Sequence, residues 1–126
     1  MDNRLYGYLL DDDIIFNIAT RRFIHHKDED ADCHMFFKTT SLSETQTRLF
    51  IFLMKNRSHE VINKNDIFVN VWDEFKMSSS SQRLWQTVND LRKKMSSIGL
   101  PDNFIESVHG MGYRIGSSHV RELKIS

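Results

Sequence analysis

The chain has 126 residues, of which 40% are hydrophobic and 27% are charged, and its formal net charge is zero. This length suits one compact domain, and the ordinary globular composition excludes a chain that is disordered throughout. The single cysteine, Cys33, excludes an internal disulfide framework, and no apolar run approaches the roughly 18–20 residues of a membrane span. The first residues also lack the apolar stretch of a signal peptide, so we expect a cytoplasmic chain.

The charges are distributed unevenly along the chain. Residues 1–50 carry six basic and nine acidic side chains, whereas residues 51–126 carry eleven basic and eight acidic ones. From Lys76 onward there are eight basic and four acidic residues. This asymmetry predicts a basic interaction surface toward the C-terminal end.

The first forty residues are expected to form a small antiparallel sheet of four strands. Ile14, Phe16 and Ile18 alternate with Ile15 and Asn17, which is the period-2 pattern of a strand. Partner strands are expected at residues 6–10, 22–25 and 35–38, and the polar stretches 11–13 and 27–32 are expected to form turns.

Two helices are predicted next. The first begins at Ser43, which forms a capping box with Gln46, and Asn56 can end it. The second begins at Asn63, with Asp66 three residues further on. Both carry apolar residues at helical spacing: Leu49, Phe50, Leu53 and Met54 in the first, and Ile67, Phe68, Val71 and Trp72 in the second.

A third helix is predicted at about residues 80–97, and it separates apolar from polar residues. Gly99 and Pro101 supply its stop signals. The residues expected to be buried are Leu84, Val88, Leu91 and Met95. The residues expected to point away from that stripe are Gln82, Gln86, Asn89, Asp90 and Lys93, with Arg83, Trp85 and Arg92 on the flanks.

The residues after the third helix predict a β-hairpin tipped by glycine. Residues 104–108 and 113–115 have the pattern of strands, and the turn between them contains Gly110 and Gly112. Residues 116–126 show no strong pattern. We therefore expect a domain over residues 1–116 and a tail or linker over residues 117–126.

Together these elements predict an α+β fold, a winged helix-turn-helix with an N-terminal antiparallel sheet, three helices and a C-terminal β-hairpin wing. In such a fold the third helix enters the major groove of DNA, and the wing, residues 104–115, touches the backbone or the minor groove. Gln and Asn amides can bond adenine bidentately, and Arg83, Arg92 and Lys93 can neutralise phosphates. The alternative interpretation is a solvated helix face without any DNA contact, which fits any amphipathic helix.

Two sequence motifs resemble the OmpR/PhoB-type family of winged-helix DNA-binding domains. These are LWQTVNDLRKK at residues 84–94 and IESVHGMGYRI at residues 105–115, and the resemblance covers residues 6–115. The chain is most similar to the ToxR/CadC-like branch of bacterial transcription regulators, because no receiver domain precedes the motifs and IGLP stands at residues 98–101. In that branch the DNA-binding domain is N-terminal and cytoplasmic, so a membrane span is expected only outside this chain.

The resemblance implies which side chains contact DNA. Asp90 stands where some members have a base-reading arginine, and an Asp can only accept, for example from cytosine N4. His109 replaces a frequent arginine, which weakens attraction to the minor groove at neutral pH. The implied contacts are Gln82, Arg83, Gln86, Thr87, Asn89, Asp90, Arg92 and Lys93 in the helix and Ser107, His109 and Tyr113 in the wing.

The expected partner is double-stranded promoter DNA, bound by a dimer or by tandem copies. The loop of residues 73–79 is a candidate surface for RNA polymerase or a neighbouring protomer. The alternative function is a protein-interaction module that keeps the winged-helix scaffold without DNA affinity, which the zero net charge and Asp90 favour. Trp85 is interpreted either as a base-edge or sugar contact or as packing against the loop before the helix.

No enzymatic activity, metal or cofactor is predicted. His25, His26, Cys33 and His34 lack the paired spacing of a zinc site, and residues 11–13 are expected to be a solvated turn. The two glycines of the wing tip are too few for a dinucleotide-binding loop, and no constellation of Ser, His and Asp stands out.

Overall fold

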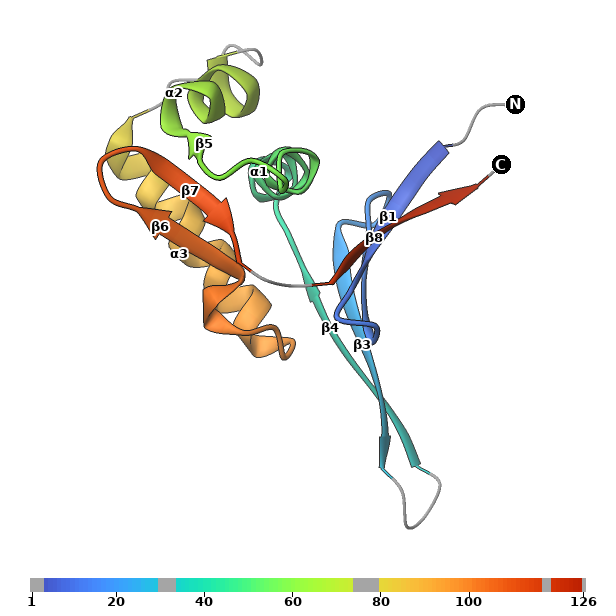
Figure 1. Cartoon of the computed structure of the whole chain (residues 1–126). Helices are drawn as coiled ribbons and strands as arrows, with labels where there is room; N and C mark the ends of the chain where they lie inside the picture. Colours follow the sequence, from blue (N-terminus) through green and yellow to red (C-terminus); the bar gives the residue numbers. More distant parts are fainter. Residues whose placement is uncertain (1–3, 30–33, 74–79, 117–118, 126) are drawn as a thin grey trace.

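The computed structural model describes residues 4–29, 34–73, 80–116 and 119–125, which form two small sheets and three α-helices (Figure 1). The predicted α+β winged-helix fold is confirmed. In chain order the elements are β1 (Arg4–Leu10), β2 (Ile14–Asn17), β3 (Arg22–Glu29), β4 (His34–Ser41), α1 (Glu44–Lys55), β5 (Ile62–Asn63), α2 (Lys64–Ile67), a π-helical turn (Phe68–Trp72), α3 (Ser81–Ser97), a 3₁₀ turn (Asp102–Phe104), β6 (Ile105–Val108), β7 (Gly112–Ile115) and β8 (Val120–Ile125).

The N-terminal sheet has five antiparallel strands in the order β4-β3-β2-β1-β8. The four predicted strands are present. Residues 120–125, which we expected in a tail or linker, instead form β8 and pair with β1 from Arg4↔Ile125 to Leu10↔Val120. The turn predicted at residues 27–32 is also partly wrong, because β3 continues to Glu29.

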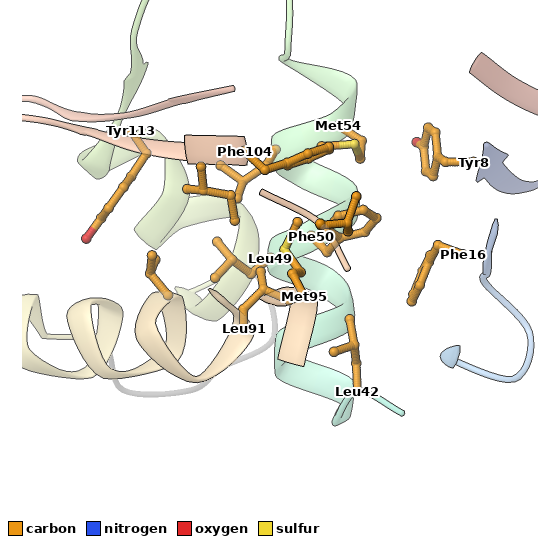
Figure 2. Close-up of a cluster of buried hydrophobic side chains, with 14 of the residues drawn as sticks. Tyr8, Phe16, Leu42, Leu49, Phe50, Met54, Leu91, Met95, Phe104 and Tyr113 are labelled. Atoms are coloured by element: carbon orange, nitrogen blue, oxygen red, sulfur yellow. The ribbon is translucent and has the colours of Figure 1, made fainter. Parts of the chain in front are cut away.

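The hydrophobic core lies on both sides of α1, which stands between the N-terminal sheet and α3 (Figure 1). On the sheet side, the Phe50 ring lies 4.9 Å from the Phe16 ring and 5.1 Å from the Phe23 ring, centroid to centroid. On the other side, Leu49 lies in one cluster with Leu91 and Met95 of α3 (Figure 2). Burial of each such side chain contributes about 1.5–3 kcal/mol, so the helices hold their places mainly through this core.

The helix starts and ends follow the predicted local signals. The Ser43 hydroxyl accepts from the Gln46 backbone N–H, the Gln46 side chain accepts from the Ser43 N–H, and Asn56 caps the C-terminal end. The Asn63 side chain accepts from the Asn65 N–H at the start of α2. The buried stripes predicted in α1 and α3 are confirmed, and Ile67, Val71 and Trp72 are buried as well.

The second sheet, in the order β5-β7-β6, places the hairpin β6–β7 beside α3. Gly112 lets β7 approach β5, because a Cβ added there would lie 2.0 Å from the carbonyl oxygen of Ile62. Within the described ranges, no helix has the length and apolar character that a bilayer crossing requires.

Candidate nucleic-acid interface

The outer face of α3 carries the polar side chains that the sequence pattern assigned to it. Ser80 caps the helix, its hydroxyl accepting from the Arg83 N–H at 3.1 Å. Of the predicted contacts, Gln82, Arg83, Gln86 and Lys93 are exposed, and Thr87, Asn89, Asp90 and Arg92 are half-buried. The apolar stripe on the opposite side is fully covered, so the helix presents one solvated polar face and one buried face.

Two of these side chains form a hydrogen bond with each other along the helix. Gln86 Nε2 donates to Asp90 Oδ1 at 3.0 Å, which is the i, i+4 geometry of a helix surface pair. Thr87 Oγ1 donates to the Arg83 carbonyl oxygen at 2.8 Å. Gln86 therefore keeps its carbonyl oxygen and one amide hydrogen for a ligand, while Asp90 adds an acceptor beside it.

Arg92 joins α3 to the wing. Its Nε and Nη2 donate to the Ile105 carbonyl oxygen at 3.1 and 2.7 Å, and Nη2 also donates to Ser107 Oγ at 3.0 Å. Its guanidinium carbon lies 5.7 Å from the centroid of the Tyr113 ring. Arg92, Ser107 and Tyr113 thus hold the wing at a defined distance from the helix, a role that the sequence pattern did not indicate.

Tyr113 is the buried member of this joint. It pairs with Ile62 of β5 and Ser107 of β6, and its side chain extends from β7 toward α3 (Figure 2). Burial raises the pKa of the Tyr113 phenol, an effect that the nearby Arg92 guanidinium partly offsets. The phenol is therefore neutral at physiological pH and can donate a hydrogen bond.

The tip of the wing is exposed and is attached to α2. His109, Gly110 and Met111 are exposed, and Gly110 has φ +72°, a conformation that favours glycine in a tight turn. The Lys64 backbone N–H donates to the Met111 carbonyl oxygen at 3.0 Å. On the strands behind the tip, Arg114 Nε donates to Glu106 Oε2 at 2.6 Å.

Two hollows lie on the same face of the molecule, and Trp85 lines both. The first, of about 270 Å³, lies between the start of α3 and the wing and is also lined by Lys64, Ser81, His109 and Met111. The second, of about 580 Å³, runs along α3 past Gln86, Asn89, Arg92 and Lys93. Trp85 is 58% exposed, so its side chain is not buried in the protein interior. Lys64 and Met111 were missed by sequence reasoning, since only tertiary structure brings them beside α3.

The cations of α3 differ in their surroundings. Lys94 Nζ donates to the Ser41 carbonyl oxygen at 2.7 Å and to Gln46 Oε1 at 2.8 Å, so it ties α3 to the start of α1. Arg83 and Lys93 are exposed and form no ion pair with any residue that the structure describes. These two side chains are the ones best placed to meet an anionic ligand.

Other candidate residues do not form a site. His25 is hydrogen-bonded to Asp13 and to the Ile98 carbonyl oxygen, and Cys33 lies outside the described residues. Within the described part of the chain, no three His, Cys, Asp or Glu side chains gather as metal ligands would. The proposed polymerase loop, residues 73–79, also lies outside the described residues apart from Asp73.

The comparisons with known proteins agree with this geometry. The family model described as "Transcriptional regulatory protein, C terminal" matches residues 38–115, more than half of the chain. No curated protein sequence matches the chain significantly.

Among solved structures, the DNA-binding domain of E. coli CadC is similar with a TM-score of 0.67 and 15% identity, over 97% of this chain and 100% of that one. The DNA-binding domain of response regulator AdeR, solved in complex with an intercistronic region, has a TM-score of 0.62 and 19% identity, over 83% and 95%. The C-terminal domain of the nisin resistance regulator NsrR has a TM-score of 0.53 and 26% identity, over 62% and 76%. From the family match and the shared fold, this chain belongs to the OmpR/PhoB-type family of DNA-binding domains found in transcriptional regulatory proteins.

Proposed function

We propose that the chain binds double-stranded DNA in a sequence-specific manner, with α3 in the major groove and the β6–β7 wing at the backbone or the minor groove. The observation that carries this proposal is the polar outer face of α3, with a wing held beside it by Arg92. The AdeR domain, which has the same fold, was solved in complex with an intercistronic region. Family membership supports DNA as the ligand.

The eleven candidate contacts fall into three groups by their surroundings. Gln82, Gln86 and Asn89 can read base edges through their amides, with Asp90 as an acceptor and Thr87 beside them. Arg83, Lys93 and His109 can meet phosphates or the minor groove. Arg92, Ser107 and Tyr113 form the joint between helix and wing, so we propose that they act chiefly by positioning the wing.

One such domain offers few phosphate contacts, so we infer that tight binding requires two copies on tandem half-sites. We further propose that the domain works in the cytoplasm as part of a regulator of transcription, with residues 73–79 as a surface for RNA polymerase.

The experiment is a selection of duplexes from a random pool, followed by titration of the selected and scrambled duplexes at several salt concentrations. We expect a strong preference for the selected sequence and an affinity that falls steeply with salt. Lys93→Ala should weaken binding to both duplexes about equally. The matched control is Lys55→Ala, which replaces an exposed lysine of α1 and should change the affinity for neither duplex. Equal binding to both duplexes would contradict sequence specificity.

A second candidate function is a protein-interaction module that does not bind DNA. The Gln86–Asp90 hydrogen bond favours it, because the pair places a carboxylate on the face that would approach phosphates. Binding to no duplex at low salt, with the chain folded, would make this function the better one.

A further inference from the structure

The hollow between the start of α3 and the wing has an apolar wall exposed to solvent. Trp85 is 58% exposed and Met111 is 51% exposed, and both line it. Exposed aromatic and thioether side chains that face one hollow lower the free energy of a complex when a ligand covers them. Most other large apolar side chains in the described part of the chain are buried or half-buried.

Three polar residues, called its rim below, also line the hollow. Lys64 carries an ammonium group, His109 an imidazole and Ser81 a hydroxyl group. A ligand that fits has an apolar carbon face between anionic ends. A deoxyribose between two phosphates has this chemistry, and the apolar carbon face can lie against Trp85 while the phosphates meet the rim.

We propose that this hollow holds a deoxyribose of the DNA strand that passes between α3 and the wing, and that Trp85 and Met111 contact its carbon face. The proposal rests on the proposed function, in which α3 enters the major groove and the wing lies at the backbone or the minor groove, so that one strand passes between them. A ribose would bring a 2′-hydroxyl group against the apolar faces of Trp85 and Met111, where it loses its water. The hollow therefore selects DNA over RNA at one nucleotide of each half-site.

A thymine methyl group is the other apolar group of DNA that could fill the hollow. The position of the hollow favours the sugar. It lies between helix and wing with Lys64 and His109 on its rim, whereas Gln86 and Asn89 line the second hollow along α3. A methyl group read in the major groove would lie near those amides, away from the phosphates.

The test uses the selected duplex with one 2′-hydroxyl group introduced at a time along both strands. At one position of each half-site, the parent protein should bind about five- to tenfold more weakly, which corresponds to the loss of hydration of one polar group. Trp85→Ala and Met111→Ala should bind the all-DNA duplex more weakly and should lose most of the penalty at that position. Val69→Ala is the matched control, because Val69 is 53% exposed and does not line the hollow.

A ribose also changes the local sugar conformation, so the decisive quantity is the difference in penalty between the parent and Trp85→Ala. An unchanged penalty in Trp85→Ala, or the absence of any position-specific penalty, overturns the proposal. A loss of affinity on replacing one thymine by uracil, abolished in Trp85→Ala, would assign the hollow to the methyl group instead. Failure of the parent to bind any duplex would contradict the proposed function itself, and the melting temperature of each variant shows that it is folded.

Discussion

His25 Nδ1 lies 2.9 Å from the carbonyl oxygen of Ile98, the residue that caps the C-terminal end of α3. A carbonyl oxygen only accepts, so Nδ1 carries a proton and donates it. On the other side of the ring, Nε2 lies 3.1 Å from Asp13 Oδ2. The ring therefore bridges the Ile98 carbonyl oxygen at the end of α3 and the Asp13 carboxylate in the turn before β2. This buried side chain thereby links the N-terminal sheet to the candidate recognition helix.

Replacing this link should lower the free energy of unfolding. We expect His25→Leu to cost about 1–3 kcal/mol, because the Ile98 carbonyl oxygen loses its buried donor. Asp13→Asn should cost much less, because the Asp13 side chain is 56% exposed. Chemical denaturation of the two variants measures both values, and a His25→Leu variant as stable as the parent would show that the contact contributes nothing.

Arg92 and Lys93 are neighbours that should respond differently to substitution. Arg92→Ala should cost about 1–3 kcal/mol of stability, since the Ile105 carbonyl oxygen loses its donors. In Arg92→Ala, the backbone amides of the wing should exchange hydrogen faster than in the parent, while the dependence of affinity on salt should stay near that of the parent. Lys93→Ala should leave stability unchanged and flatten the salt dependence by about one charge.

The two measurements separate positioning from phosphate contact. Hydrogen exchange at Tyr113 reports on the joint directly, because Tyr113 lies against Arg92. Should Arg92→Ala leave exchange at the wing unchanged and alter only the salt dependence, Arg92 is a phosphate contact and the joint does not depend on it.

The phenol of Tyr8 makes stability depend on alkaline pH. Burial raises its pKa in the folded protein, the Glu122 carboxylate raises it further and the Arg57 guanidinium lowers it. The neutral phenol is therefore favoured by folding, and its contribution is fully present below the unfolded pKa of about 10. As the pH rises through the higher folded pKa, that contribution is lost.

Tyr8→Phe should remove this part of the loss of stability at alkaline pH. At neutral pH the variant should be as stable as the parent or slightly more stable, because the Tyr8 hydroxyl is buried with no hydrogen-bond partner in the described ranges. Denaturation midpoints between about pH 8 and pH 11 test this for parent and variant together. Parallel curves would show that Tyr8 does not titrate in this range. Tyr113→Phe is the comparison, since the pKa of Tyr113 is also raised.

Local signals explain which parts of the fold could be predicted. The capping box at Ser43 and the stripe of α3 depend on residues three to seven positions apart, so the sequence shows them directly. Strand β8 could not be predicted in this way. Its partner β1 is more than a hundred residues away. As an edge strand, β8 has only Val120 and Leu123 half-buried, and its other four side chains are exposed.

The same distinction applies to the site. The polar face of α3 follows from helical periodicity alone, and Gln82, Gln86 and Lys93 are exposed as predicted, whereas Asn89 and Asp90 are half-buried. The role of Arg92 depends on a carbonyl oxygen thirteen residues away, and the hollow at Trp85 depends on Met111 of the wing and Lys64 of α2. Their assignment needs the packed structure, because no motif brings these residues together.

The two faces of α3 should separate stability from recognition. Leu91 is fully buried, so Leu91→Ala should cost about 2–5 kcal/mol of stability. Gln86 is exposed, so Gln86→Ala should fold normally. If Gln86 reads a base, its loss should cost about 1–3 kcal/mol of specific binding and relax the preference at one or two base pairs.

Asp90→Asn tests the hydrogen-bonded pair of Gln86 and Asp90, because it keeps the shape of the side chain while removing the charge beside Gln86. Unfolding midpoints and titrations with matched and mismatched duplexes give both quantities. Full specific binding by Gln86→Ala and by Asn89→Ala would show that α3 does not read bases, and the protein-interaction function would then explain the polar face better.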